Sequence, residues 1–544
     1  MVTGDINKIN LSISSFKRMI TDGNLYVDKT KLIERFLESA STVQLIARQR
    51  RLGKSLNMDM LRCFLTDDED LRYLFKGLYI TESPAWSKAN TAPVFYFDFK
   101  GLRPDTYKMQ IINQCYKHIC KMTTPDNLNH YLKHKYAQLL NNPSMATEGL
   151  HFLTEVTYEL TGKRSYLLID EYDKLLMENY NNNKYEEISA FETALLSSAL
   201  KGNEYLEKAL LTGVMRISHE SMLSGLNNIV THDVFDDETY TDDYGLTEEE
   251  VQALSKMSPF DVDKARGWYN GISIGDKPIY NIYAMMSYLS KGKFGCYWGK
   301  SGTMDTIAGL LNDGRRATIA RLLNGEIVEA AIADRISLRD LSARPSDQAF
   351  YSLLIQTGYL ALNKPASEAD FNAFISIPNI ELKIVWKQFI LEKLYPTSPQ
   401  IRTLFDNTSD LDVFAKNIEY FLANRLSYHD IAIHKDEAQG QVHERLYHIF
   451  LLGILSAYDD VHCGYPLSNR ESGDGRYDIL VKKSNENFIF EFKASDRADN
   501  LTEKAQEALN QIEIKRYGTD LGDKKRLVKV GVAFHGKLCC VKCN

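Results

Sequence analysis

The sequence predicts a multidomain α/β protein. Its first domain is expected to be built on a parallel sheet, followed by a helical connector and a small α/β/α domain. Strand-like and helix-like runs alternate over the first ~230 residues, a mostly helical pattern follows to about 430, and strand-like runs return around one helix near the C-terminus. Strands separated by long helical runs are typical of parallel sheets with crossover helices. A winged-helix fold is one alternative for the connector.

Length and composition limit the interpretation further. At roughly 100–200 residues per domain, 544 residues suggest about three domains, and we expect them at 1–285, 286–432 and 433–544. A net charge of −7 provides no global basic field for nucleic acid, so binding of a polyanion must rely on local patches. The sparse cysteines and the lack of a leader-like or membrane-spanning run predict a cytoplasmic protein with no membrane partner.

The first strand-like run, "TVQLIA" (42–47), leads into the loop "RQRRLGKS" and then into the helical pattern "LNMDMLRCFL". This order suits a phosphate-binding loop, in which backbone N–H groups and a helix N-terminus surround the phosphates. Gly53 allows close approach of the backbone, Lys54 would reach the β- and γ-phosphates, and Ser55 would offer its hydroxyl to Mg²⁺. The nucleotide predicted for this loop is ATP.

The entrance of this loop departs from the pattern G-x-x-x-x-G-K-[ST], because the first glycine position holds Arg48. Arginine cannot adopt a left-handed backbone as freely as glycine does. We therefore expect the backbone at the start of this loop to approach the phosphates along a different path. Arg48 is nevertheless counted among the nucleotide-binding candidates. Arg50 and Arg51 are available for phosphate contacts or for contacts between subunits of a homo-oligomer. The alternative interpretation of these arginines is a solvated basic turn.

Two later strands supply the partners that a phosphate loop requires. "YLLIDEYD" ends in acids, where Asp170 would hold Mg²⁺ and Glu171 would polarise an attacking water as a general base. "KALLTGV" ends at Thr212, a candidate sensor of the γ-phosphate, with Arg216 just beyond as a candidate sensor or finger. The alternative interpretation of Arg216 is a surface charge at the start of a helix.

A second group of candidate residues lies near the C-terminus, in "GDGRYDILVKKSNENFIFEFKA". Asp478 opens one apolar run, and Glu491 and Lys493 lie on the next. Alternation along a strand places Glu491 and Lys493 on one face, and the turn "KKSNEN" would pair the two runs as a hairpin. Asp478 and Glu491 are therefore candidate Mg²⁺ ligands, and Lys493 would orient water and stabilise developing charge.

This C-terminal segment resembles the PD-(D/E)XK nuclease superfamily, which implies a restriction-endonuclease-like α/β/α fold. Glu444 in "VHERLYH" matches the acid often found on that fold's first helix, and Gln511 in "ALNQIEIKRY" matches a recurring active-site glutamine. Tyr477 departs from the proline usual before the first acid. The alternatives left open are a hairpin with solvated charges and a folded domain without catalytic activity.

The N-terminal half resembles the bacterial AAA-ATPase-like proteins, through "LYVDKTKLIERFLE", "RQRRLGKSLNMDML", "LLIDEYDKLL" and "LTGVMRISHESMLSGLNNI". That family typically carries arginine at the first glycine position, so Arg48 agrees with it, whereas Gln49 and Leu52 depart from proline and phenylalanine. The resemblance implies an ATPase core with nucleotide at Lys54 and Ser55. The segment "WYNG" (268–271) reads as packing and turn chemistry.

Together these features predict an ATP- and Mg²⁺-dependent hydrolase coupled to a metal-dependent nuclease. Its expected partner is nucleic acid, with DNA favoured over RNA, and the pairing of activities suggests a role around foreign or mobile DNA, such as defence. The alternative from another class is a nucleotide-dependent binding switch whose nuclease-like domain grips its partner without cutting.

Overall fold

The structure is a computed structural model of the chain. It describes residues 2–180, 182–216, 228–235, 239–275, 277–298, 307, 309–323, 325–333, 336, 345–365, 372–389, 408–425, 467–482, 486–495, 497–519, 521, 525–535 and 538–544. The chain divides into two compact units. Unit 1 comprises Met1–Ser301 and Ile327–Leu382, and unit 2 comprises Gly302–Glu326 and Lys383–Asn544.

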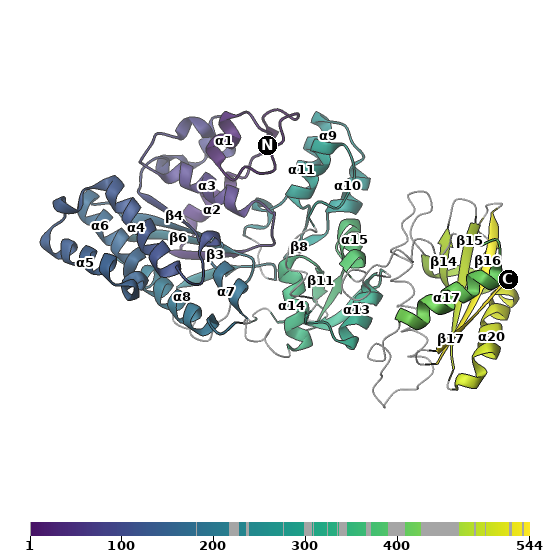
Figure 1. The fold of residues 1–544 in the computed structure, drawn as a ribbon. Helices are drawn as coiled ribbons and strands as arrows, with labels where there is room; N and C mark the ends of the chain where they lie inside the picture. The colour runs from purple at the N-terminus through teal and green to yellow at the C-terminus, as the bar shows by residue number, and fades with distance from the viewer. Residues whose placement is uncertain are drawn as a thin grey trace. The chain divides into compact units, whose positions relative to one another are not determined.

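Unit 1 is built on the predicted parallel sheet, whose five strands have the order β4-β5-β6-β3-β7 (Figure 1). The strands are β3 (Val43–Ala47), β4 (Val94–Asp98), β5 (Ser165–Asp170), β6 (Leu206–Gly213) and β7 (Ile229–His232). All four neighbouring pairs are parallel. The phosphate-loop strand β3 therefore lies next to β6, and β6 lies next to the acidic strand β5. The carboxyl ends of these three strands meet at one edge of the sheet.

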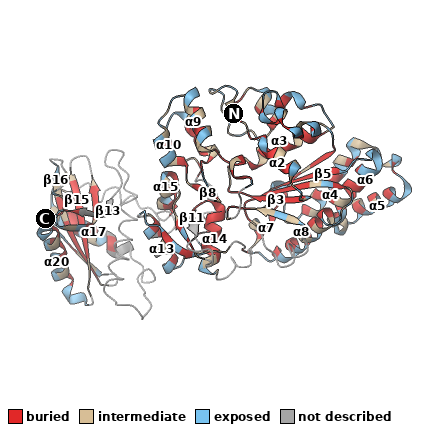
Figure 2. Ribbon diagram, turned by 180° about the vertical axis from the view of Figure 1, so that it is seen from behind, coloured by how far each residue is buried: buried red, intermediate tan, exposed pale blue. Residues whose placement is uncertain are grey.

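Apolar runs form these strands because helices cover both faces of the sheet. In Figures 1 and 2, α2 and α3 lie on one side, and α7 and α8 lie on the other. All residues of β3 and β5 are buried, and Figure 2 shows these strands in red. Ile46 and Leu168 belong to the same core cluster as Leu61 and Phe64 of α3. Full burial of each such side chain stabilises the folded state by about 1.5–3 kcal/mol.

The helices that accompany this sheet connect successive strands or precede the first one. They are α1 (Phe16–Thr21), α2 (Lys31–Glu38), α3 (Lys54–Leu65), α4 (Tyr107–Met122), α5 (His130–Asn141), α6 (Gly149–Thr161), α7 (Lys174–Asn179) and α8 (Tyr185–Leu200). A short antiparallel pair, β1 (Val2–Thr3) with β2 (Tyr26–Val27), joins the N-terminus to the segment before α2.

The rest of unit 1 mixes helices with short antiparallel strands. Helices α9 (Glu248–Met257) and α10 (Val262–Tyr269) precede the hairpin of β8 (Ile272–Ile274) and β9 (Lys277–Ile279) in the sequence, and α11 (Ile282–Lys291) follows it. A capping box of Thr247 and Glu250 begins α9. A three-stranded antiparallel sheet of order β10-β12-β11 follows, made of β10 (Val328–Ala331), β11 (Ala361–Pro365) and β12 (Asn372–Ser376), with α14 (Asp347–Thr357) between β10 and β11. These strands were not predicted from the sequence, because runs of three to five residues give little alternation to detect.

Unit 2 contains a five-stranded mixed sheet of order β13-β14-β15-β16-β17. The strands are β13 (Leu467–Ser472), β14 (Gly475–Lys482), β15 (Glu486–Ala494), β16 (Arg526–His535) and β17 (Leu538–Cys543). The predicted hairpin of β14 and β15 is confirmed as an antiparallel pair, and β15 then pairs in parallel with β16. The connection between those parallel strands contains α20 (Leu501–Ile514).

Helix α20 lies very close to β16. A methyl group added at Gly531 would lie 2.3 Å from the Ala505 carbonyl oxygen and 2.6 Å from the Leu509 nitrogen. The other described helices of this unit are α13 (Asp313–Leu323) and α17 (Leu411–Arg425), and α15 (Ile380–Phe389) runs from unit 1 into unit 2. None of the helices described in either unit is long and apolar enough to cross a membrane.

Candidate functional site

The predicted phosphate loop runs from the end of β3 to the start of α3. Gly53 ends it with φ +95°, a left-handed conformation that glycine adopts at little cost, and Lys54 begins α3. The Lys54 side chain is only 6% exposed, and its ammonium donates to the carbonyls of Arg48 and Gln49 at 3.0 Å each. Burial lowers the pKa of Lys54, and the charges of Glu171 and Asp170 oppose this shift.

The acids predicted beside the loop lie at the end of β5. Asp170 is buried, and its carboxylate accepts hydrogen bonds from the Thr212 hydroxyl (2.5 Å) and from the Tyr96 hydroxyl (3.2 Å). Glu171 follows with φ +53°, a left-handed conformation that is uncommon for a residue with a side chain. Parallel pairing of β5 with β6 and of β6 with β3 thus brings Asp170, Thr212 and the loop to one edge of the sheet.

Asp173 is a further buried acid at this edge, and it is not among the predicted site residues. Its carboxylate accepts the backbone N–H groups of Val214 and Met215 at 2.8 Å each, just after β6. Burial raises its pKa, and the two N–H groups oppose that shift. Asp173 therefore ties the chain after β5 to the chain after β6. The signal that could have found it is the acid two residues after Glu171 in "IDEYD".

A cavity of about 520 Å³ opens beside the loop. Six of the predicted residues line it: Arg50, Arg51, Gly53, Lys54, Ser55 and Glu171. Its other walls include Lys100, Lys174 and an apolar part with Met19, Ile282 and Met286. A cavity lined by basic, hydroxyl and apolar side chains fits a molecule that carries both phosphates and a flat apolar ring.

Four predicted nucleotide-binding residues do not line this cavity: Arg48, Asp170, Thr212 and Arg216. The Arg48 guanidinium is fully buried, donates to the carbonyls of Ala47 and His232, and lies 5.5 Å from the ring centre of Tyr244. In this position Arg48 joins β3 to β7. The Arg216 guanidinium pairs with Asp233 at 3.3 Å.

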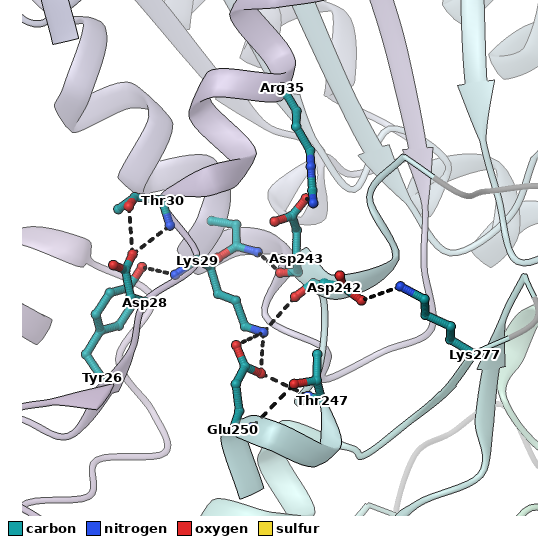
Figure 3. A network of polar contacts seen from close by, with 11 residues as sticks. Tyr26, Asp28, Lys29, Thr30, Arg35, Asp242, Asp243, Thr247, Glu250 and Lys277 are labelled. Atoms are coloured by element: carbon teal, nitrogen blue, oxygen red, sulfur yellow. Dashed lines mark hydrogen bonds and ion pairs between the residues drawn. The ribbon is translucent and has the colours of Figure 1, made fainter. Parts of the chain in front are cut away.

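A buried polar network (Figure 3) reaches the cavity through Lys29 and Asp243, which both line it. The Lys29 ammonium donates to both carboxylate oxygens of Glu250 at 2.7 Å and to the Asp242 carbonyl at 2.8 Å. Arg35 of α2 pairs with Asp243, the last residue of the short 3-10 helix η7 (Thr241–Asp243). Burial raises the pKa of Asp243 to about 6, and Arg35 opposes that shift.

The same network holds the phosphate loop. Asn57 of α3 donates to the Asp243 carbonyl at 2.8 Å, and the Gly245 N–H donates to the Leu52 carbonyl at 3.0 Å. Gly245 has φ +78°, and an added methyl group would lie 2.7 Å from the Tyr280 carbonyl oxygen. The segment before α9 is therefore fixed to both sides of Gly53. No sequence motif predicted this connection, because its partners lie about 190 positions apart.

The second candidate site lies on β14 and β15 of unit 2. The antiparallel register pairs Ile479 with Phe490, which places Asp478 opposite Glu491 one step further along. The Asp478 carboxylate accepts the Phe492 N–H at 2.9 Å. Burial raises its pKa to about 6, while the Phe492 N–H and the charge of Lys493 oppose that shift.

Helix α20 brings Gln511 to this site. The Gln511 amide donates to the Glu491 carboxylate, and it lies 3.5 Å from the Tyr517 hydroxyl. Tyr517 is buried beside Tyr477.

Carboxylate oxygens are donors that suit Mg²⁺, so Asp478 and Glu491 fit a metal of that class. Within the described residues, no three His, Cys, Asp or Glu side chains gather as a metal-binding group. The remaining predicted acid, Glu444, lies outside the described residues.

Comparisons with known proteins agree with both predicted resemblances. An uncharacterized protein in the vnfD 5' region of Azotobacter chroococcum mcd 1 is 26% identical over 402 residues, covering 72% of this chain and 71% of that protein. Two solved structures show low TM-scores. The ORC2 protein of Aeropyrum pernix scores 0.31 at 13% identity and covers 69% of this chain and 98% of its own. Drosophila ORC bound to AT-rich DNA and Cdc6 scores 0.15 at 11% identity, covering 69% and 91%.

Two family profiles match separate parts of the chain. Residues 10–223 match the family described as predicted AAA-ATPase, and this range contains the phosphate loop and strands β3 to β6. Residues 442–543 match the PD-(D/E)XK nuclease superfamily, and this range contains Asp478, Glu491, Lys493 and Gln511. The chain thus carries an N-terminal domain of the AAA-ATPase-like family and a C-terminal domain of the PD-(D/E)XK nuclease superfamily.

Proposed function

We propose that this protein binds and hydrolyses ATP in the cavity beside Lys54, and that this activity is coupled to a nuclease activity centred on Asp478 and Glu491. The observation that carries the proposal is the meeting of a phosphate loop with the acids of β5, at the cavity that Glu171 lines. The domain limits 1–285, 286–432 and 433–544 remain part of this proposal.

In the ATPase site, Lys54 would exchange its two carbonyl acceptors for phosphate oxygens, which are stronger acceptors because they are charged. Ser55 and Asp170 would hold Mg²⁺, which when bound neutralises charge on the phosphates. Glu171 lines the cavity and would accept a proton from the attacking water. Thr212 holds the Asp170 carboxylate in place by its hydrogen bond, so its proposed role is one of orientation.

In the nuclease site, Asp478 and Glu491 would hold a divalent metal, and Glu444 would add a further acid. When bound, such an ion polarises the phosphodiester and activates water. Gln511 orients the Glu491 carboxylate, and Lys493 would stabilise charge that develops on the phosphate. The substrate we propose is nucleic acid, with DNA favoured, and a role in defence or mobile-element biology fits this pairing.

The test measures two activities of the full chain. Loss of ATP turnover in Glu171→Gln with retained nucleotide binding would support a true ATPase, and unchanged turnover would reject Glu171 as the base. Metal-dependent cleavage of DNA and RNA is compared for wild type, Asp478→Ala and Lys493→Ala, with and without ATP. Equal cleavage by all three proteins would refute the nuclease assignment. Cleavage by none of them, with nucleotide binding intact, would favour a binding switch instead.

A further inference from the structure

The phosphate loop is held from outside the AAA-like sheet by two consecutive residues, Tyr297 and Trp298. The Trp298 side chain is 3% exposed, and its indole N–H donates to the Arg50 carbonyl at 3.0 Å. In the opposite direction, the Arg51 guanidinium donates to the Tyr297 carbonyl at 2.6 Å and lies 4.2 Å from the ring centre of Tyr283. Arg50 and Arg51 line the nucleotide cavity, so this attachment is made at the cavity wall.

A single carboxylate holds these two residues in turn. Glu381, in the first turn of α15, is 2% exposed and accepts the N–H groups of both Tyr297 and Trp298 through one oxygen, the latter at 2.5 Å. Burial raises the pKa of Glu381 to about 7, and the two N–H groups oppose that shift. A continuous chain of hydrogen bonds thus runs from the phosphate loop through Trp298 to α15.

The segment that leads into α15 is fixed by a hydrogen bond and by close packing. Asn379 donates to the Asn270 carbonyl at 2.8 Å, and Gly271, at φ +96°, approaches so closely that an added methyl group would lie 2.4 Å from the Pro378 carbonyl oxygen. This contact gives the segment "WYNG" the packing role that its sequence suggested. Helix α15 continues to Phe389, and the boundary between the two units falls inside this helix, after Leu382. The helix that receives the chain of hydrogen bonds therefore leads along the sequence into the unit that carries the nuclease-like domain.

We propose that Trp298 and Glu381 are positioning residues that transmit the conformation of the phosphate loop to α15. Leaving a buried donor or acceptor without its partner costs about 1–3 kcal/mol, so a shift of the Arg50 carbonyl on nucleotide binding favours a matching shift of Trp298 and Glu381. The inference rests on the proposed function, because it requires nucleotide in the cavity. It adds the route by which that nucleotide would act on the rest of the chain.

Hydrogen exchange of the full chain, with and without a non-hydrolysable ATP analogue and Mg²⁺, tests this relay. In wild type we expect nucleotide to change exchange in peptides covering 296–298 and 380–389. Trp298→Phe keeps an aromatic ring and removes the indole donor. It should bind the analogue with an affinity changed by less than about tenfold, yet lose the nucleotide-dependent change at 380–389. Trp86→Phe is the matched control, since Trp86 packs with Phe64 and Phe75, and it should behave as wild type.

Glu381 gives a second, independent pair of variants. Glu381→Gln retains a side-chain oxygen that can accept both N–H groups and should preserve the change at 380–389, whereas Glu381→Ala should abolish it. The relay is overturned if Trp298→Phe and Glu381→Ala respond like wild type, or if wild type binds nucleotide without any change at 380–389. Absence of nucleotide binding by wild type, measured by calorimetry, would overturn the proposed function and the relay together.

Discussion

Replacing Lys54 by methionine tests the nucleotide site most directly. Methionine keeps an unbranched side chain of similar length in a buried position and removes only the ammonium group. Because Lys54 is 6% exposed and already reaches two acceptors at 3.0 Å, its bonds to phosphate would form away from bulk water. A hydrogen bond to a charged group contributes about 1.5–3 kcal/mol, which corresponds to roughly 10- to 150-fold in affinity.

The assay is calorimetric titration of the full chain with ATP and Mg²⁺. Lys100→Met is the matched control, because Lys100 lines the same cavity from an exposed position and the two variants have the same net charge. We expect Lys54→Met to remain folded, since burial already disfavours the charged lysine. Wild-type affinity in a folded Lys54→Met variant, or an equal loss in Lys100→Met, would refute the assignment of this lysine to the phosphates.

Three further predictions concern stability. Gly531→Ala should lower the stability of unit 2 by about 1–3 kcal/mol or more, because its methyl group meets the backbone of α20. Gly309→Ala is the control, because open space surrounds Gly309 and the stability of this variant should not change. Thermal unfolding compares the two variants. Asp173→Ala should destabilise unit 1 by about 2–5 kcal/mol in chemical unfolding, because it leaves the buried N–H groups of Val214 and Met215 without their acceptor. Burial raises the pKa of Asp243 to about 6, so the folded protein holds this proton more tightly than the unfolded chain does. The resulting contribution to the free energy of unfolding is complete below about pH 4 and is lost as pH rises through 6. The unfolding free energy of wild type relative to Asp243→Asn should therefore fall by up to about 3 kcal/mol over that range, and a flat difference would contradict this.

Much of the fold could be predicted because its signals are local. The strands β3 and β5 are short apolar runs that end in a loop or in acids, and the β14–β15 hairpin shows as two apolar runs around a polar turn. The short strands β10 to β12 could not be predicted, because they are stabilised by pairing with one another more than by their own pattern.

The candidate sites divide in the same way. Lys54, Glu171 and Glu491 are recognisable because their chemistry requires a fixed spacing from neighbours in the sequence. Trp298 and Glu381 have no such spacing, since they contact the loop or its attachment from about 250 and 85 positions away. Arg48 shows the opposite case, in which a local pattern gives an incomplete picture. Its position in the loop made it a candidate for binding phosphate, and tertiary packing places its guanidinium against Tyr244 and backbone carbonyls.

The backbone of Glu171 has a consequence for how this position can vary among relatives. At φ +53° a residue with a side chain is strained by about 1–3 kcal/mol, and glycine or asparagine would relieve most of that strain. Selection for stability alone would therefore favour those two residues here. If Glu171 is the proposed general base, a glutamate retained at this position would mark a lineage that still depends on the carboxylate, and glycine or asparagine would mark lineages that do not.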